Sequence, residues 1–143
     1  MSVAALRAWL AAHGLPADGS ADLAAMVALR DTVRELLLAR IENRRPAPSA
    51  VEAVNAAAAP TAPRLVWGDA PRVERAGGAL ALIAADAIEL VTERHGDLLH
   101  CSAPGCVRLL IKDHPRRQWC STRCGDRVRA SRYYHRHRKG TSL

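Results

Sequence analysis

Phenylalanine is absent from this sequence, and aromatic residues make up only 3% of its 143 positions. The hydrophobic fraction is nevertheless 49%, and much of it is alanine. Because alanine side chains are small, we expect a core of closely packed helices. No apolar run approaches the roughly 20 residues of a membrane-spanning helix, and the N-terminus lacks the basic region and apolar run of a signal peptide. These absences predict a soluble, cytoplasmic protein.

Motifs of common enzyme classes are also missing. There is no glycine-rich phosphate loop and no His-Glu-x-x-His motif of zinc proteases. His13 and His95 are isolated along the chain, so we expect them at helix ends or on the surface. No internal repeat of roughly 20 to 50 residues is present. Catalysis is therefore not expected.

Four cysteines, all in the last third of the chain, form two pairs. Four residues separate the first two, thirteen separate the pairs, and three separate the last two: Cys101, Cys106, Cys120 and Cys124. Two short cysteine loops joined in this way can place four thiolates about 2.3 Å from one tetrahedral zinc ion. Disulfides would require an oxidising compartment, and a redox pair would favour Cys-x-x-Cys beside a βαβ unit. The spacing predicts one structural zinc ion with no open coordination position.

Residues near the cysteines bear on this prediction. Gly105 and Gly125 each follow or precede a predicted ligand, where a tight turn favours a residue without a Cβ. His100 and His114 flank the site, and either could replace a cysteine, although four thiolates already complete a structural shell. A module this small cannot bury enough surface to fold alone. We expect zinc to contribute directly to its folding, with the roughly 10–16 kcal/mol typical of zinc-finger peptides.

The segment between the cysteine pairs predicts a β-hairpin. Residues 107–111 and Gln118–Trp119 suit its two arms, with a turn at residues 113–116. Leu110 and Trp119 are the expected packing residues. From Asp126 to Lys139 the sequence has neither glycine nor proline and predicts a helix that begins at the metal.

Positive charge is concentrated in the same region. Residues 101–143 hold eleven Arg or Lys side chains against two acidic ones, a formal charge of +9, whereas the first hundred residues carry −2. One zinc ion with four thiolates would lower the charge by about two units and leave the region strongly basic. A basic region with tyrosines among its arginines is typical of a polyanion-binding protein. The candidate nucleic-acid contacts are Arg116, Arg117, Arg123, Arg127, Arg129, Arg132, Arg136, Arg138 and Lys139.

The basic side chains of the expected helix surround it instead of sharing one face. This distribution suits insertion between phosphate groups more than docking onto an acidic protein surface. Arginine can also hydrogen-bond the edges of guanine bases, so recognition of a particular DNA sequence is a second role that these side chains allow. For Arg127 a second role is equally open, because it could instead hydrogen-bond the zinc loops from the start of the helix.

The first hundred residues predict a helical domain with one small hairpin. Caps and stops place helices from Ser2 to Gly14, over about residues 21–43 with Ser20 as cap, and from a Ser49 capping box to Ala58. In the first of these helices, Leu6, Trp9 and Leu10 belong to the apolar stripe. A fourth helix follows Gly77–Gly78, with Asp86, Glu89 and Glu93 on its solvated face. Arg64–Trp67 and Arg72–Arg75 predict a hairpin, with Pro71 restricting it to a sheet edge.

The predicted fold class is therefore mainly α, of the α+β type. A helical domain covers residues 1–97, a zinc module with a hairpin and a basic helix covers 98–139, and 140–143 form a tail.

The stretch from Cys101 to Arg138 resembles the CGNR zinc-finger family. The signature of that family is two cysteine pairs, a Trp-Cys before the second pair and a final Cys-Gly-Asn-Arg. This chain has Trp119-Cys120 and then Cys124-Gly125-Asp126-Arg127, so Asp126 stands where the family has asparagine. Aspartate keeps the acceptor oxygen of asparagine but loses its NH2 donor and adds a negative charge.

Proteins with this finger usually carry an N-terminal helical domain of the ABATE type and are regarded as stress-induced regulators of transcription. The ABATE pattern would place a strand and an Asn-Thr pair before the first helix, whereas this sequence begins directly at the helix after Ser2. The resemblance implies a DNA-binding regulator associated with the nucleoid, whose helical domain senses an effector or forms a homodimer. RNA binding and a zinc-stabilised protein-interaction module are the alternatives, and no membrane partner is expected.

Overall fold

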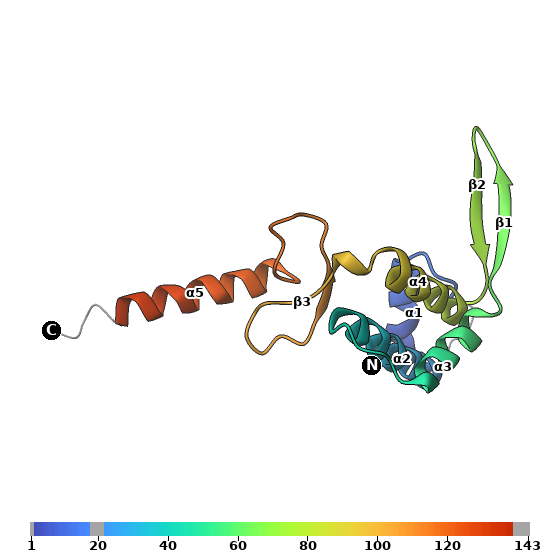
Figure 1. Cartoon of the computed structure of the whole chain (residues 1–143). Coiled ribbons are helices and arrows are strands. Elements are labelled where there is room, and N and C mark those ends of the chain that lie inside the picture. Colours follow the sequence, from blue (N-terminus) through green and yellow to red (C-terminus); the bar gives the residue numbers. More distant parts are fainter. Residues whose placement is uncertain (1, 18–21, 139–143) are drawn as a thin grey trace. The chain divides into compact units, whose positions relative to one another are not determined.

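The computed structural model describes residues 2–17 and 22–138, which fold as two units, the first ending at Arg94 and the second beginning at His95 (Figure 1). The first unit contains α1 (Val3–Ala12), α2 (Leu23–Ile41), α3 (Pro48–Ala58), β1 (Ala62–Trp67), β2 (Pro71–Ala76) and α4 (Ala79–Glu93). The second contains a 3-10 helix η1 (His95–Asp97), β3 (Leu98–His100), β4 (Leu109–Ile111) and α5 (Thr122–Arg138). The expected fold class, mainly α with small hairpins, is confirmed.

Helix α1 begins and ends where the sequence predicts. The Ser2 hydroxyl accepts a hydrogen bond from the Ala5 N–H at 3.2 Å. At the other end Gly14 has a φ of 67°, and the N–H of Leu15 donates to the Leu10 carbonyl at 2.9 Å. This left-handed residue closes the helix as a Schellman motif.

One expectation for α1 is wrong. Leu6 and Leu10 are buried, but Trp9 is 45% exposed and does not extend the apolar stripe. Instead its ring lies against that of His13, with centroids 4.4 Å apart. Trp9 is adjacent to Leu10 in sequence, and neighbouring helical residues point about 100° apart, so the two cannot share one narrow buried face.

Helix α2 is capped by Asp22, whose carboxylate accepts the Ala24 N–H at 3.0 Å. The predicted cap, Ser20, lies outside the described residues. The helix ends through Asn43, which has a φ of 52°, and the Arg44 N–H donates to the Ala39 carbonyl at 2.9 Å. Asparagine tolerates this left-handed conformation better than most residues other than glycine.

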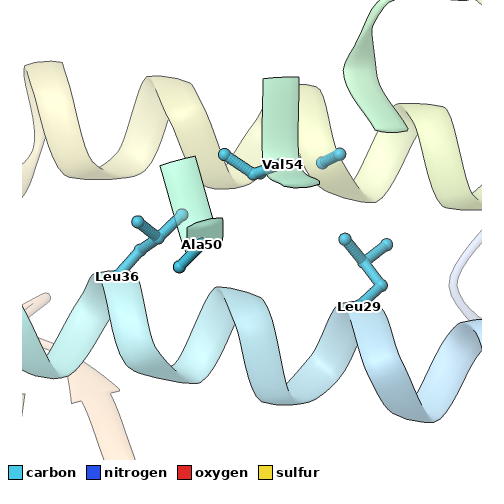
Figure 2. Close-up of a cluster of buried hydrophobic side chains, with 5 residues drawn as sticks. Leu29, Leu36, Ala50 and Val54 are labelled. Atoms are coloured by element: carbon cyan, nitrogen blue, oxygen red, sulfur yellow. The ribbon is translucent and has the colours of Figure 1, made fainter. Parts of the chain in front are cut away.

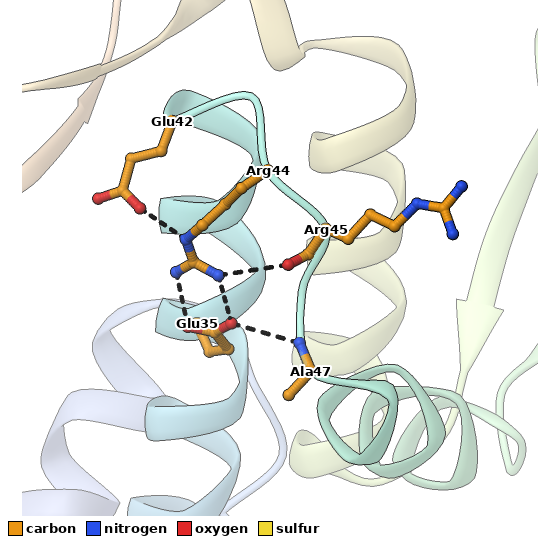
Figure 3. Close-up of polar contacts among 5 residues, drawn as sticks. All are labelled: Glu35, Glu42, Arg44, Arg45 and Ala47. Carbon is orange, nitrogen blue, oxygen red and sulfur yellow. Dashed lines mark hydrogen bonds and ion pairs between the residues drawn. The ribbon is translucent and has the colours of Figure 1, made fainter.

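The turn after α2 is held by an arginine between two glutamates (Figure 3). Arg44 binds Glu35 with two hydrogen bonds, at 2.7 and 2.9 Å, and its Nε binds Glu42 at 2.7 Å. The Arg44 side-chain hydrogen bond lowers the pKa of Glu35 below its usual 4.5. The same carboxylate accepts the Ala47 N–H at 3.4 Å, which positions the start of α3.

Helix α3 begins at Pro48, one residue before the predicted start. Ala47 is its N-cap and makes no side-chain cap, so the expected Ser49 capping box is wrong. Proline is favoured at the first helical position because its fixed φ suits the helix. The N–H that it lacks would have had no helical partner there.

The first unit is packed around small side chains. Leu29 and Leu36 of α2 meet Ala50 and Val54 of α3, and Ala84 of α4 completes the cluster with no exposed surface (Figure 2). A second cluster joins α1 to the start of α2 and α4 through Leu6, Leu10, Met26 and Ala79. Alanine at these positions lets the helices approach closely, as the composition predicts.

The predicted hairpin of the first unit is confirmed as β1 and β2, which pair antiparallel from Ala62 opposite Ala76 to Trp67 opposite Pro71. An ion pair of 2.7 Å between Arg75 and Glu89 connects β2 to α4. The Glu89 side chain is 43% exposed, so it lies on a solvated face as predicted and pairs with Arg75 at the surface. None of the helices in the described ranges combines the length and apolar composition that crossing a bilayer requires.

Candidate zinc centre and basic helix

The structure brings the four cysteine sulfurs together. All four lie within 4.8 Å of one another. The Sγ atoms of Cys106, Cys120 and Cys124 form a triangle with sides of 3.8, 3.7 and 3.8 Å. A tetrahedral zinc ion with Zn–S bonds of about 2.3 Å has sulfur–sulfur edges of about 3.8 Å. The arrangement therefore matches a four-thiolate zinc site, and its sulfurs are too far apart for disulfides, which need about 2.05 Å.

The first cysteine loop lies between β3 and β4. These strands pair antiparallel, with Leu99 opposite Leu110, and the Cys101 N–H donates to the Arg108 carbonyl at 2.9 Å just beyond the pair. Within the loop Gly105 has a φ of 70°, as expected for a tight turn beside a ligand.

This pairing corrects the predicted hairpin. Residues 109–111 pair with residues 98–100, which precede the first cysteine, and not with Gln118–Trp119. The predicted second arm makes one backbone contact elsewhere, from the Ser102 N–H to the Gln118 carbonyl at 2.9 Å. The cysteine loop itself supplies the turn that brings these two strands together.

The second cysteine pair leads directly into α5. This helix begins at Thr122, so the predicted start at Asp126 is wrong, and Cys124 lies in the first turn. Ser121 precedes the helix, and its hydroxyl accepts the Cys124 N–H at 3.4 Å. The cap was missed, although a serine just before a helical run is its usual signal.

Trp119 packs against the helix at Gly125. A Cβ at Gly125 would lie 2.9 Å from the indole Cε3, so this glycine serves close packing and not a turn. Leu110 and Val128 are buried in the same cluster, in which Trp119 is half-buried. The predicted packing roles of Leu110 and Trp119 are confirmed.

The pKa values of Cys101 and Cys106 are shifted in opposite directions by their surroundings. Burial raises the pKa of Cys101, but the N–H groups of Cys120 and Ala103 lower it, and the result is about 7. At Cys106 the backbone hydrogen bond with Arg108 lowers the pKa. Burial and the hydrogen bonds with the neighbouring thiols raise it by more, so the resulting pKa is about 11. Adjacent thiolates repel one another, and a divalent cation among them offsets this repulsion and releases the protons. The donor set fits zinc.

Neither flanking histidine joins the described metal-binding cluster, which consists of the four cysteines. His100 is exposed at the end of β3. His114 accepts a hydrogen bond from the Arg116 N–H through its Nδ1 at 3.1 Å, within the turn after β4.

Three of the predicted nucleic-acid contacts bind within the second unit. Arg127 donates from Nη2 to the Pro104 carbonyl at 2.9 Å, so it hydrogen-bonds the first cysteine loop. Arg129 pairs with Asp126 at 2.6 Å, and its guanidinium lies 5.6 Å from the Trp119 ring centre. The third is Arg117, which pairs with Asp113.

Four other predicted contacts, Arg116, Arg123, Arg132 and Arg136, are exposed. On α5, Tyr133 and Tyr134 are 56% and 67% exposed beside them. The side chain of Arg138 and all of Lys139 lie outside the described part of the structure. Arginines and accessible aromatic rings therefore extend along the helix that begins at the cysteine cluster.

Comparison with protein families agrees with both units. Residues 1–94 match the ABATE family, described as "Putative stress-induced transcription regulator". Residues 98–137 match the CGNR zinc finger. No curated protein matches the chain. The four clustered cysteines fall within the zinc-finger match.

Proposed function

Since this chain belongs to the ABATE family and carries a CGNR zinc finger, we propose that it is a transcription regulator that binds DNA through the zinc unit. The observation that supports DNA binding most directly is α5. This helix starts at the cysteine cluster and presents Arg132 and Arg136 with Tyr133 and Tyr134 exposed between them. Arginines that contact phosphates position a protein on the duplex, and tyrosine rings can pack against sugars or bases.

The internal contacts divide the basic residues into two groups. Arg127 and Arg129 hold the zinc loop and the Trp119 ring, so their main role in this proposal is to position α5. Among the described residues, Arg132 and Arg136 form no ion pair, which leaves their charge for phosphate groups. Arg116 and Arg123 are exposed contacts of the same kind.

The proposal includes a cytoplasmic, nucleoid-associated location and no catalysis. Four thiolates leave zinc without a position for a reacting water. A cavity of about 520 Å³ lies among α2, α3 and α4, and none of the described residues that line it is titratable. The helical unit is proposed as the regulatory part, which senses an effector or forms a dimer.

The test is binding of the full chain to duplex DNA, structured RNA and heparin across a range of salt concentrations. Each phosphate contact contributes about −0.9 to the slope of log affinity against log salt. Arg132→Ala with Arg136→Ala should therefore flatten the slope on DNA by about 1.8. The matched control, Arg7→Ala with Arg30→Ala, removes the same charge from exposed helical positions of the first unit and should leave the slope unchanged.

Zinc content and helicity must equal those of the wild type in every variant. An unchanged slope in the α5 variant, or binding that does not depend on salt, would leave protein docking as the function of the zinc unit. Tighter binding to RNA than to DNA would favour the RNA alternative. Equal affinity for all three polymers would reduce the activity to non-specific polyanion binding.

A further inference from the structure

The β1–β2 hairpin is exposed to an unusual degree for a folded element. Every residue of β2 is exposed, and in β1 only Val66 is partly covered. Leu65, Trp67 and Val73 are 64%, 76% and 68% exposed. A two-stranded hairpin alone is at best marginally stable in water, and it gains stability when further strands join it. In the described chain these two strands form a sheet with no third member.

Each strand of this sheet has one free edge and one proline. Pro63 is the second residue of β1, and Pro71 is the first residue of β2. In an antiparallel pair the N–H groups of alternate residues face the partner strand, and the others face the free edge. The residues from Arg72 to Ala76 all have an N–H, so the outward-facing ones can donate to another strand at the β2 edge.

The charges of β2 are self-complementary. Arg72 and Glu74 lie on either side of Val73, and within one chain they form an ion pair of 2.9 Å. If two copies of β2 run antiparallel about a two-fold axis at Val73, Arg72 of each copy lies opposite Glu74 of the other. Opposite charges that face each other across strands are stabilising, and like charges are destabilising. A centre at Leu65 of β1 would create no such pair, because Arg64 would face Val66.

We propose that this protein forms a homodimer in which β2 pairs antiparallel with β2 of a second copy about Val73. A two-fold interface uses the same surface twice, so both Arg72–Glu74 contacts form together. Leu65 is the register partner of Val73, and both side chains lie on one face of the sheet. The four-stranded sheet then carries an apolar row that runs from Leu65 through both Val73 side chains to the second Leu65.

Charge reversal tests this pairing in the full chain, without nucleic acid, by sedimentation velocity over a range of protein concentrations. Arg72→Glu should weaken dimerisation at least about tenfold because two glutamate pairs then face each other, and Glu74→Arg should do the same with two arginine pairs. Mixing the two single variants should restore a dimer, because each contact in the mixed pair again joins opposite charges. The double variant R72E/E74R should restore a homodimer for the same reason.

The matched control is Arg30→Glu, which reverses one exposed arginine of α2 and should dimerise like the wild type. Equal helical circular dichroism in all variants separates weakened pairing from misfolding. As a second readout, the backbone N–H groups of β2 that face away from β1 should become protected from hydrogen exchange as the wild-type concentration rises.

A wild type that stays monomeric at every concentration would overturn the proposal. So would single variants that dimerise like the wild type, or a mixture of them that remains monomeric. The proposal develops the dimerisation role suggested above but does not depend on DNA binding, because no nucleic acid is present in the assay. Loss of salt-dependent DNA binding with dimerisation intact would reject the proposed function alone.

Discussion

Removal of zinc should unfold the second unit and leave the first unit folded. All four cysteines belong to the second unit, which begins at His95, so a chelator has no comparable target in the first. The buried residues of the cysteine cluster are few: Cys101, Ala103, Leu110 and Val128. Three of the cluster's partly buried members, Cys106, Cys120 and Cys124, are themselves ligand candidates. Much of this small core thus consists of the metal site.

The size of the effect follows from the contribution of zinc. Structural zinc contributes about 10–16 kcal/mol to the folding of zinc-finger peptides, which is comparable to or larger than the total stability of a typical domain, about 5–15 kcal/mol. Helix α5 has 17 residues and packs mainly through Val128 and the Trp119 contact at Gly125. An isolated helix of this length is marginal in water, so α5 should unravel when the cluster opens.

The assay is far-ultraviolet circular dichroism during titration with a chelator. Helices α1 to α4 have 10, 19, 11 and 15 residues, so loss of the 17 residues of α5 should lower the helical signal by roughly a quarter. Cys106→Ser should reproduce this loss, whereas Ser102→Ala, an exposed neighbour in the same loop, should not. A chelated protein that keeps its full helical signal, or that loses all of it in one step, would refute the reasoning.

The remaining predictions concern the first unit. Leu10→Ala should destabilise it by about 2–5 kcal/mol, because removing the fully buried Leu10 side chain leaves a cavity. The control is Val3→Ala, at a 49% exposed position of the same helix, which should cost under about 0.5 kcal/mol. Thermal unfolding measures both changes. Glu35 should stabilise the unit fully above about pH 4.5 and lose this effect as the pH falls through its lowered folded-state pKa. Urea midpoints of wild type and Glu35→Gln should therefore differ near neutral pH and converge in acid, and a difference independent of pH would contradict the Glu35–Arg44 contact.

The zinc site could be predicted from the sequence because ligand spacing is a local property. The interval from Cys101 to Cys106 and that from Cys120 to Cys124 each fit a short loop, whatever the rest of the chain does. Strand pairing was harder, because it depends on which segments the closed cluster brings together. Three-residue strands carry too little alternation to specify a partner, so the sequence predicts residues 107–111 opposite residues 118–119, whereas the structure pairs residues 109–111 with residues 98–100.

Helix starts show a second limit of sequence analysis. Both Ser49 and Pro48 carry start signals for α3, and only the structure shows that proline occupies the first position. At α5, a glycine beside a ligand is typical of a turn, so the sequence predicts a helix start after Gly125. The helix instead begins after Ser121, whose hydroxyl caps it. The need for glycine comes instead from Trp119, whose contact depends on tertiary packing and leaves no signal in the neighbouring sequence.

The departure from the zinc-finger signature at Asp126 has a structural role in this chain. Its carboxylate lies one turn before Arg129 on α5 and accepts a hydrogen bond from that guanidinium at 2.6 Å. The same guanidinium lies over the Trp119 ring, which in turn packs on Gly125. The negative charge that aspartate adds near the thiolates is thus paired with an arginine that covers the tryptophan. Asparagine could accept the same hydrogen bond but without the charge, so aspartate makes this contact with Arg129 charge-assisted, beside the Trp119 ring that the same guanidinium covers.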